Sequence, residues 1–338
     1  MGVRRHLERG LNAIWYGGSW LRFLLWPLSA LFRFAVACRR IAYRHGLVKS
    51  ANPGVAVVVI GNISIGGTGK TPLTIWLAER LAERKYRVGV IASGYGGEAS
   101  DWPRRVTADD DAALVGDEAA LLARRLDCPV IAGPDRVAAA KRLLDEAQLD
   151  VILSDDGLQH YRLARDAEVA VIDGTRGFGN GHCLPAGPLR EPPSRLREVD
   201  AVVINGGDFE WERSFRAEMS AVRVVEVGGK EVRDLEEFRD QRVHAVAAIG
   251  NPERFFGFLE DAGLDVDPRA FADHARIGSQ ALRFDDDDPI LITEKDAVKC
   301  SALDIRNLWC VVTEFAFAPG HGERLLRTLT PLIDRVRS

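Results

Sequence analysis

The sequence predicts an α/β protein with a doubly wound, mostly parallel sheet, a second and smaller α/β domain, and a separate N-terminal helical segment. Short β-branched runs alternate with helical patterns along most of the chain, as expected of a parallel sheet covered by helices. One of these runs leads directly into a glycine-rich loop and a helix. The chain has 338 residues, and at about 150 residues per domain this length favours two domains.

The composition is typical of a globular protein in a reducing compartment. Hydrophobic residues make up 46% of the chain and charged residues 28%, which excludes a disordered or collagen-like protein. The five cysteines are odd in number and lack CxxC spacing, which argues against a disulfide framework and a cysteine zinc site and favours the cytosol. The net charge of −4 is unevenly distributed, because residues 1–50 carry nine Lys or Arg and one acid. This basic segment is expected to face an anionic partner.

The first helical segment is strongly apolar over residues 15–38 and contains three of the seven tryptophans. Apolar residues recur at three- and four-residue steps, as on one helix face: Leu21, Leu24, Leu25, Leu28, Leu31 and Phe32. With flanking arginines, this pattern favours a helix lying in the plane of a membrane surface, attracted to anionic headgroups by about 1 kcal/mol per charge. A helix buried inside the protein and a membrane span are the alternatives. The span is disfavoured because Arg22, Pro27 and Arg33 interrupt the apolar run.

A phosphate-binding loop is predicted after the first buried strand. Residues 55–60 form a short β-branched run, as expected of a strand buried on both faces. A glycine-rich segment, Gly-Lys-Thr and a helical pattern to about residue 85 follow, which is the context that a P-loop requires. The residues expected to bind the nucleotide are Ser64, Ile65, Gly66, Gly67, Thr68, Gly69, Lys70 and Thr71.

The chemistry of this loop follows from its residue types. Glycines let backbone N–H groups wrap phosphates at a helix N-terminus, while Lys70 is expected to bridge the β- and γ-phosphates and Thr71 to ligate Mg²⁺. Ser64 stands where the motif usually has its first glycine, so Gly66 and Gly67 are expected to supply the backbone freedom. The alternative is a glycine-rich turn that only tightens the joint between strand and helix.

A second polar site is predicted where the strand at 151–154 ends in Asp155-Asp156-Gly157. Ligands bind at the carboxyl ends of strands in open α/β sheets, and an aspartate beside the P-loop strand is placed to hold Mg²⁺. Asp-Asp-Gly is also good turn chemistry, but the upstream P-loop favours a metal and phosphate role. Because adjacent side chains point in different directions, the two aspartates are expected to have different roles.

Other elements extend the α/β pattern. Further strands are predicted at 88–92, 130–132, 169–173, 201–205, 244–249, 289–293 and 308–313, and further helices at 117–126, 136–148, 253–261 and 323–336. We therefore expect a membrane-associating helical segment over 1–50, a P-loop core over 51–207, a smaller α/β domain over 208–322, and a terminal helix over 323–338 that is available to pack back on the core.

The segment over residues 173–193 is a candidate substrate-contacting loop. It is rich in Gly and Pro, and loops of this length in compact domains are usually functional or disordered. Its Arg176, Arg190 and Glu191 are candidates for contacting a polar or phosphorylated substrate. The alternative is a connector between domains whose charges are only solvated.

Three polar features have a purely structural alternative. Asp117 follows a glycine and suits a helix N-cap. His274 follows an aspartate in a loop of the second half, and an isolated histidine is more often structural than catalytic. The four aspartates at 285–288 are expected to form a solvated turn, although four acids could bind a cation weakly.

Taken in order, a longer set of motifs is highly specific, although a P-loop alone would not be. The set comprises Gly61-Asn62, Gly66 to Pro72, Gly94-Tyr95-Gly96, Gly116-Asp117-Glu118, Asp155 to His160, Gly179-Asn180-Gly181, Leu184 to Pro192, Ile249 to Pro252, Asp273-His274 and Thr293 to Ala297. With these motifs, most of the chain resembles the tetraacyldisaccharide 4′-kinase family, the lipid A 4′-kinases of Gram-negative bacteria.

The resemblance implies an activity and a location. The expected reaction transfers the γ-phosphate of ATP to the 4′-hydroxyl of tetraacyldisaccharide 1-phosphate, which gives lipid IVA in lipid A biosynthesis. ATP and Mg²⁺ are the cofactors that it implies. The expected partners are the lipid A disaccharide 1-phosphate and an anionic membrane surface at the cytoplasmic face of the inner membrane, with no nucleic acid and no obligatory protein partner.

The resemblance also implies residue roles. Asp117 is expected to accept the sugar hydroxyl proton with the help of His274, since a carboxylate can orient an imidazole and tune its basicity. The other catalytic residues that it implies are Lys70, Asp155 and Asp156, and the metal ligands are Thr71, Asp155 and Asp156. Asn251 joins the ATP site, and the substrate side comprises Asn62, Gln159, His160, Arg190 and Glu191. The second domain is expected to close over ATP and exclude water.

Two departures and two alternative functions accompany this resemblance. Ser93 stands where the family tends to have arginine, and Ala119 where it usually has proline; neither has a catalytic role here. The alternatives are a membrane-docked P-loop ATPase or GTPase switch that regulates a protein partner, and a soluble small-molecule kinase. The motifs at 184–192 and 273–274 favour the lipid kinase over the switch, and the tryptophan-rich basic segment argues against the soluble kinase.

Overall fold

The first half of the chain forms a parallel sheet whose strands are buried. The computed structural model describes residues 10–300 and 303–337. Across the sheet the parallel strands are β7 (Ala201–Asn205), β6 (Ala167–Asp173), β1 (Ala56–Gly61), β5 (Val151–Ser154), β2 (Val88–Ala92) and β4 (Val130–Ala132). The short β3 (Arg104–Val106) closes this edge antiparallel to β4. The β-branched runs of the sequence therefore became strands buried on both faces.

Helices cover both faces of this sheet, as the doubly wound prediction requires. One face packs against α3 (Lys70–Glu83), α5 (Asp117–Arg125) and the C-terminal α9 (His321–Arg337), with the short α4 (Ala112–Val115) beside α5. The other face packs against α6 (Arg136–Glu146). Alternate residues of β1 serve the two faces, since Val58 belongs to the first core and Val57 and Val59 to the second. The predicted fold class is confirmed.

The second half of the chain forms a smaller α/β unit. Its strands are β10 (Arg242–Ala247), β11 (Asp265–Ala270), β12 (Ile290–Thr293) and β13 (Leu308–Phe317), which run parallel to their neighbours in the order β11-β10-β12-β13. The helices of this half are α7 (Pro252–Asp261) and α8 (Glu294–Cys300). The remaining pieces of this half are β9 (Val232–Arg233) and the short 3-10 helices η2 (Leu235–Phe238) and η3 (Ser279–Leu282), while a third 3-10 helix, η1 (Pro193–Arg197), lies in the first half before β7.

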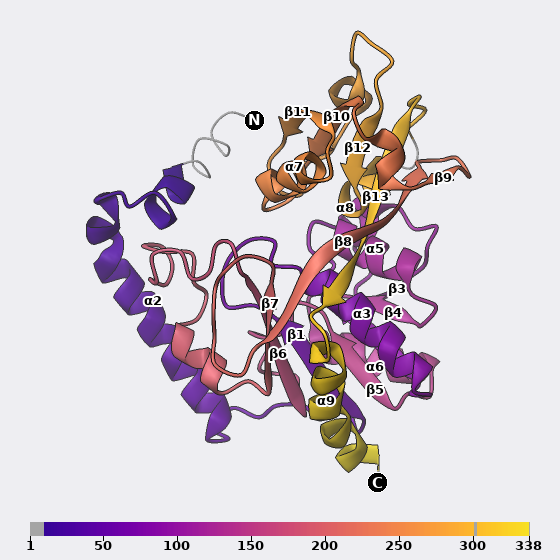
Figure 1. Cartoon of the computed structure of the whole chain (residues 1–338). Helices are drawn as coiled ribbons and strands as arrows, with labels where there is room; N and C mark the ends of the chain where they lie inside the picture. The colour runs from indigo at the N-terminus through magenta and orange to yellow at the C-terminus, as the bar shows by residue number, and fades with distance from the viewer. Residues whose placement is uncertain (1–9, 301–302, 338) are drawn as a thin grey trace.

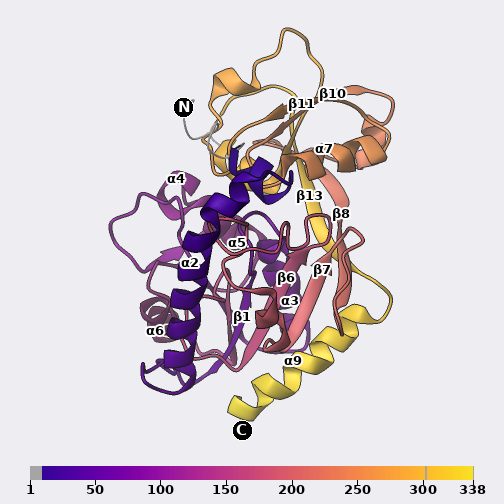
Figure 2. The same cartoon turned by 90° about the vertical axis from the view of Figure 1, so that its left-hand side faces the viewer.

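A long strand that the sequence did not predict joins the two halves. In β8 (Phe215–Glu226), the first residues pair in parallel with β7, and most of the strand pairs antiparallel with β13. Among the described residues the sheet therefore runs without a break from β11 to β3, with the small half above the core in Figures 1 and 2. Backbone hydrogen bonds between β7 and β8 join the segments on either side of residue 208, so the sheet itself marks no domain boundary there. The division at residue 208 therefore stays a prediction.

The pattern of β8 explains why it escaped prediction. Its twelve residues mix buried, half-buried and exposed positions without strict alternation. They therefore match neither of the two strand patterns, the alternation of apolar and polar residues or a short continuous apolar run. The strands β3 and β11 and the helix α8 were also not predicted, and β13 continues four residues beyond the predicted end at 313. The three strands are stabilised by pairing with distant strands, which a local pattern does not contain.

The N-terminal helix α2 (Leu21–Arg44) lies along the outside of the core (Figure 2). Ser29 Oγ donates a hydrogen bond to the Cys183 carbonyl at 2.7 Å, and the ring of Tyr43 stacks on Tyr161. By length and composition α2 is able to cross a membrane. Only 6% of its most apolar stretch is buried inside the protein. The alternative of a helix buried inside the protein is therefore wrong.

The outward side of α2 is apolar. Its exposed large side chains are Leu21, Phe23, Leu24, Trp26, Leu28, Leu31, Phe34 and Ile41, and the exposed Trp20 directly precedes the helix. The predicted stripe was correct for Leu21, Leu24, Leu28 and Leu31, but Leu25 and Phe32 are less exposed and belong to the inward side. The apolar surface is wider than one stripe, because aromatic residues continue it around the helix.

Candidate active site

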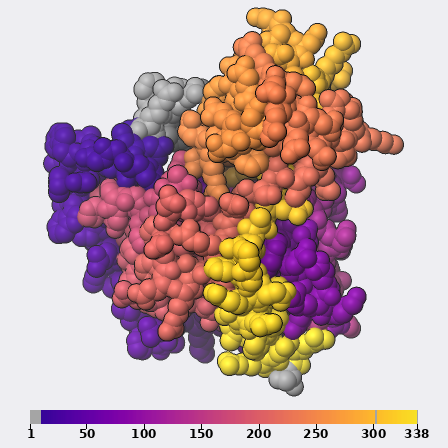
Figure 3. Space-filling model, in the orientation of Figure 1, coloured from indigo at the N-terminus to yellow at the C-terminus, as the bar shows by residue number. Residues whose placement is uncertain are grey.

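The polar residues that the sequence singled out meet at the carboxyl ends of β1 and β5. Two adjoining cavities lie there, a large one of about 1070 Å³ and a small one of about 230 Å³. Both are lined by the P-loop and by the second half, which covers this end of the core in Figure 3. The residues common to the two are Gly67, Lys70, Glu118, Ile249, Gly250 and Lys295.

The P-loop has the backbone shape that its glycines permit. The helix α3 begins at Lys70, and Gly69 before it has a φ of 95°, in the left-handed region that favours glycine. Gly66 also has a positive φ, whereas Ser64 does not. The backbone N–H of Ile65 donates to the Pro188 carbonyl at 2.8 Å, which ties the loop to the 173–193 segment. Ser64 is therefore tolerated, because the positions that need a positive φ are Gly66 and Gly69.

Asp155 is buried beside the start of α3. Its carboxylate accepts hydrogen bonds from the Thr71 and Thr74 hydroxyls, each at 2.9 Å. Burial and the charge of Glu118 raise the pKa of Asp155 to about 6, although Lys70 acts in the opposite direction. Carboxylate and hydroxyl oxygens are the ligands that Mg²⁺ prefers. Thr71 and Asp155 therefore fit a magnesium ion, whose charge would favour the ionised form of this buried carboxyl.

Asp156 has the opposite electrostatic surroundings. Its carboxylate lies 3.6 Å from Lys70 Nζ and 3.3 Å from Arg190 Nη1. Although burial raises the pKa of Asp156, Lys70 and Arg190 outweigh it and hold the pKa at about 2. The two adjacent aspartates thus differ in their surroundings and in their pKa values, as expected. Asp156 forms ion pairs with Lys70 and Arg190.

Asp117 of the core contacts His274 of the second half. The Nδ1 atom of His274 lies 3.0 Å from both carboxylate oxygens of Asp117. Because an ionised carboxylate only accepts hydrogen bonds, Nδ1 carries a proton. Burial raises the pKa of Asp117, but the hydrogen bond from His274 and the charge of Lys295 outweigh it, and the pKa is lowered. The two residues form a carboxylate–histidine pair, of which His274 lines the large cavity.

Helix capping does not account for Asp117. The helix α5 begins at Asp117 itself and its N-cap is Gly116, with a φ of 87°. The Asp117 carboxylate bonds the N–H of the next residue and His274 rather than the N–H groups that a cap satisfies. The capping interpretation is therefore wrong, and a positive φ at Gly116 directs the first residue of the helix toward the second half.

The predicted substrate-side residues fall into two groups. Gln159, His160, Arg190 and Glu191 line the large cavity, and Asn62 is not among its lining residues. Asn62 is buried and its Nδ2 donates to the Gly66 carbonyl at 3.4 Å. Glu191 is buried as well, with its carboxylate against the Tyr161 hydroxyl. This geometry favours supporting roles for Asn62 and Glu191, while contact with substrate stays a prediction for all five.

His160 is held neutral in the large cavity. Burial, together with the charge of Arg136, lowers the pKa of His160 to about 4. At neutral pH this ring therefore offers one hydrogen-bond donor and one acceptor without a charge. The positive charge on this side of the cavity comes from arginines.

Three hydrogen bonds attach the second half to the core beside the P-loop. Asn251 Nδ2 donates to Asp173 at 3.2 Å, Arg176 Nη1 to the Gly250 carbonyl at 2.9 Å, and Arg254 Nη2 to Asn205 at 2.6 Å. Asn205 in turn donates to the Thr68 carbonyl of the P-loop at 3.0 Å. The position of the second half is therefore coupled to the shape of the loop.

Sequence reasoning missed several residues that line the cavities, among them Arg136, Arg254 and Lys295. Arg136 is buried and its Nη1 donates to the Gly133 carbonyl at 2.7 Å, yet in the sequence it is an ordinary first residue of a helix. Lys295 lies in the motif at 293–297, so its position in the resemblance was the available signal. Arg254 gave no signal beyond its place after Gly250-Asn251-Pro252.

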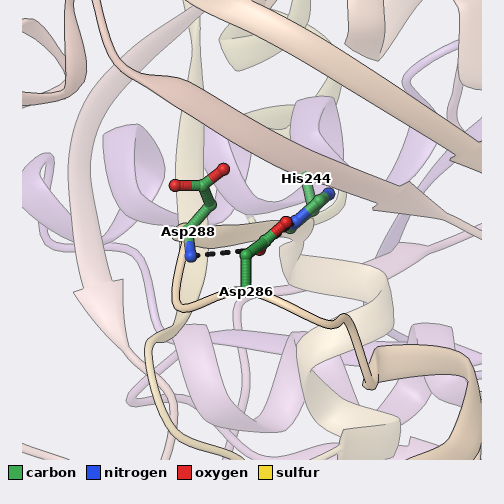
Figure 4. Close-up of side chains that lie close together, drawn as sticks. All are labelled: His244, Asp286 and Asp288. Carbon is green, nitrogen blue, oxygen red and sulfur yellow. Dashed lines mark hydrogen bonds and ion pairs between the residues drawn. The ribbon is translucent and has the colours of Figure 1, made fainter.

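A separate group of ligand-type side chains lies in the second half. The potential ligand atoms of His244, Asp286 and Asp288 all lie within 4.8 Å of one another (Figure 4). The buried His244 ring lies 2.8 Å from Asp267 through Nδ1 and 2.7 Å from Asp286 through Nε2, and it stacks on Phe284. Since each ring nitrogen has a carboxylate partner, we interpret the group as a structural network. The prediction of a merely solvated four-aspartate turn was therefore incomplete.

The chain is similar in sequence and in fold to known proteins of one family. A family model described as LpxK, tetraacyldisaccharide-1-P 4′-kinase, matches residues 21–330. A tetraacyldisaccharide 4′-kinase of Nitrosococcus oceani is 50% identical over 315 residues and 93% of each chain, and one of Alkalilimnicola ehrlichii is 48% identical over 93% of this chain and 94% of the relative. The solved "apo" form of LpxK from Aquifex aeolicus in complex with ATP has the same fold, with a TM-score of 0.76 at 24% identity over 93% of this chain and 99% of that one. The chain therefore belongs to the tetraacyldisaccharide 4′-kinase family.

Proposed function

We propose that the cleft performs the reaction of this family. The protein is an ATP-dependent kinase that transfers the γ-phosphate of ATP to the 4′-hydroxyl of tetraacyldisaccharide 1-phosphate in lipid A biosynthesis. The observation that carries the assignment of this cleft is the contact between Asp117 and His274, which lies where the P-loop cavity adjoins the large one.

ATP binds with its phosphates over the first turn of α3. The N-terminal N–H groups of the helix and Lys70 attract the phosphate charge. Thr71 and Asp155 would hold Mg²⁺, which neutralises charge on the β- and γ-phosphate oxygens when bound. Asp156 keeps Lys70 and Arg190 beside the reacting groups.

The acceptor hydroxyl attacks the γ-phosphorus from the large cavity. A new bond forms between the 4′-oxygen and phosphorus, the bond to the bridging oxygen of ADP breaks, and the hydroxyl proton passes to the Asp117–His274 pair. His274 lines the cavity while Asp117 lies behind it, so His274 makes the nearer contact and Asp117 orients the ring and balances its charge.

The large cavity suits an amphiphilic acceptor. The N-terminal segment and α2 contribute apolar residues to it, among them Trp15, Phe32 and Val36. Arg190 and His160 lie among its polar lining residues. Acyl chains therefore pack toward α2 while the sugar lies near the P-loop. The exposed apolar side of α2, with its basic flanks, docks on an anionic membrane at the cytoplasmic face of the inner membrane.

Transfer from radiolabelled ATP to purified lipid A disaccharide 1-phosphate in detergent micelles tests the function. Wild-type protein is expected to label the lipid, and Lys70→Ala is expected to abolish the labelling. If the wild-type chain binds ATP but labels no lipid, the nucleotide-switch alternative replaces the kinase, and the search turns to a protein partner.

A further inference from the structure

Arg176 follows β6 in the 173–193 segment, where a tight turn fixes its backbone. The carboxylate of Asp173 accepts hydrogen bonds from the backbone N–H groups of Thr175 at 2.9 Å and of Arg176 at 3.3 Å. The Asp173 carbonyl also accepts a bond from the N–H of Gly177 at 2.8 Å. An aspartate that bonds the backbone of the residues after it makes a defined turn. The side chain of Arg176 therefore starts from a fixed position at the carboxyl end of β6.

The guanidinium of Arg176 lies where three segments meet. Its Nη1 atom donates a hydrogen bond to the Gly250 carbonyl of the second half at 2.9 Å. The same group lies over the ring of Tyr16, with 5.4 Å between the guanidinium carbon and the ring centroid. A Cβ atom added to Gly66 of the P-loop would lie 3.5 Å from Nη1. Arg176 thus adjoins the P-loop, while the second half and the N-terminal segment hold it there.

The charge of this guanidinium is not neutralised by an acid. Among the residues that the structure describes, no carboxylate forms an ion pair with it, and its Nε and Nη2 atoms have no hydrogen-bond acceptor. By contrast, Lys70 and Arg190 are both paired with Asp156. Arg176 lines the large cavity and is absent from the small one. Two nitrogens that carry N–H groups are therefore available to an anion on the acceptor side of the P-loop.

The two cavities give the P-loop a direction. Thr68 and Gly69 line only the small cavity, and Gly66 lines only the large one. Lys70 lines both, and the lysine of a P-loop reaches the terminal phosphates of the nucleotide. A γ-phosphate that faces the acceptor therefore belongs at the end of the loop nearest the large cavity. That end is the one beside Arg176.

We propose that Arg176 is a catalytic residue that contacts the γ-phosphoryl group of ATP and stabilises its charge during transfer to the acceptor. The inference rests on the proposed function. During transfer the negative charge is spread over the phosphoryl oxygens, and an arginine can donate two parallel N–H bonds to such a group. Arg176 keeps its own charge throughout, so no proton passes to or from it. Because its Nη1 bond goes to the second half, the guanidinium is held in place only while the two halves are packed together.

Nucleotide titrations of the full-length protein test this contact without an acceptor. With Mg²⁺ present, Arg176→Met is expected to weaken ATP binding about tenfold, through loss of a hydrogen bond to a charged group, and to leave ADP binding unchanged. Arg176→Lys keeps the charge but not the planar fork, and it is expected to restore part of the ATP affinity. Arg197→Met changes an exposed arginine of η1 that is absent from both cavities, and this matched control should bind both nucleotides as the wild type does.

Two results of these titrations would overturn the proposal. Unchanged ATP affinity in Arg176→Met would mean that the guanidinium does not contact the γ-phosphate. An equal loss of ATP and ADP affinity would mean that Arg176 only holds the second half against the P-loop.

Steady-state kinetics with the lipid acceptor give a second readout. The kcat of Arg176→Met is expected to fall by about 10²- to 10³-fold, the effect of removing one group that stabilises charge in a transition state, while the KM for the lipid stays the same. A raised KM for the lipid with an unchanged kcat would assign Arg176 to the phosphate that the acceptor already carries, and would overturn the proposal. If the wild type transfers no phosphate to the lipid, the proposed function fails, and the titrations still decide whether Arg176 contacts the γ-phosphate.

Discussion

Asp155 and Asp156 are neighbours in the chain, yet their carboxyl groups have opposite preferences for a proton. Asp155 accepts bonds from two threonine hydroxyls in a buried position, whereas Asp156 faces Lys70 and Arg190. Burial without a nearby paired cation favours the neutral acid, and two cations favour the carboxylate. The Asp-Asp-Gly motif alone does not predict this difference in pKa, because the difference arises from side chains of distant elements.

Replacement of Asp155 by asparagine is expected to stabilise the nucleotide-free protein and to abolish phosphate transfer. The folded pKa of about 6 lies above the unfolded value near 3.9. The folded state therefore binds more protons between these values, and stability falls as pH rises through this window. Asp155→Asn removes that loss, so its Tm at pH 8 should exceed that of the wild type by about 2–4 °C, with a smaller difference at pH 5.

Asp156→Asn is the matched control for this experiment. Its ionised form is stabilised by Lys70 and Arg190, with a folded pKa of about 2. That contribution is present above the unfolded pKa and is lost only as pH falls toward 2. Asp156→Asn should therefore lower the Tm at pH 8, and a lower Tm for Asp155→Asn at this pH would contradict the electrostatic account of that residue.

Replacement of Asp117 by asparagine tests the catalytic pair. Without an ionised acceptor, His274 loses the group that orients its Nδ1 proton and balances charge on the ring. Turnover is expected to fall by about 10²- to 10⁴-fold. ATP affinity should be unchanged, because Asp117 is not among the residues lining the P-loop cavity. Steady-state kinetics and nucleotide titration measure the two quantities, and unchanged turnover would remove Asp117 from the mechanism.

At the scale of single elements, α2 combines two surfaces. Its inward side is held by the Ser29 bond to Cys183, the stacking of Tyr43 on Tyr161 and the ion pair of Arg40 with Glu198. Its outward side carries exposed aromatic and aliphatic side chains over most of its length. A patch of this kind marks an interaction surface rather than a misplaced core.

Charges on that outward side are expected to release the protein from membranes. Each buried large apolar side chain contributes roughly 1.5–3 kcal/mol, so the double variant Phe23→Glu/Leu31→Glu should bind anionic vesicles at least about tenfold more weakly. Cosedimentation with vesicles containing phosphatidylglycerol measures this binding. Val232→Glu places a charge on an exposed valine of β9 and should have no effect. Equal binding by the α2 variant and this control would mean that the patch faces another partner.

At the scale of the whole molecule, the candidate active site is assembled from two halves that share one sheet. The core contributes the P-loop, Asp155 and Asp117, and the second half contributes His274 and Lys295. The long strands β8 and β13 connect the halves through continuous backbone pairing. Side-chain bonds near the P-loop then set how closely the halves approach.

Loss of the bond from Arg254 to Asn205 is expected to weaken ATP binding. Asn205 also donates to the Thr68 carbonyl, so the bond supports the loop from outside. A hydrogen bond from a charged group is worth about 1.5–3 kcal/mol, so Arg254→Ala should raise the KM for ATP by about tenfold or more. Arg239→Ala, an exposed arginine absent from both cavities, is the control. An unchanged KM for ATP would show that this contact does not support the loop.

The sequence by itself determined the elements whose information is local. The β-branched runs of β1 and β5 specify buried strands, and the glycine-rich loop before Lys70 specifies a turn that the structure has at that place. Both depend on residue types within a few positions. The resemblance to the kinase family rests likewise on motifs that can be read one after another along the chain.

Only the tertiary structure decided which distant groups meet. The strand β8 has no strict alternation and exists because β7 and β13 supply its hydrogen-bond partners. The contact of His274 with Asp117, the ammonium of Lys295 beside both, and the unequal pKa values of Asp155 and Asp156 depend on through-space distances. Electrostatic energy falls with distance in space and not along the chain, so these properties arise only once the two halves are packed together.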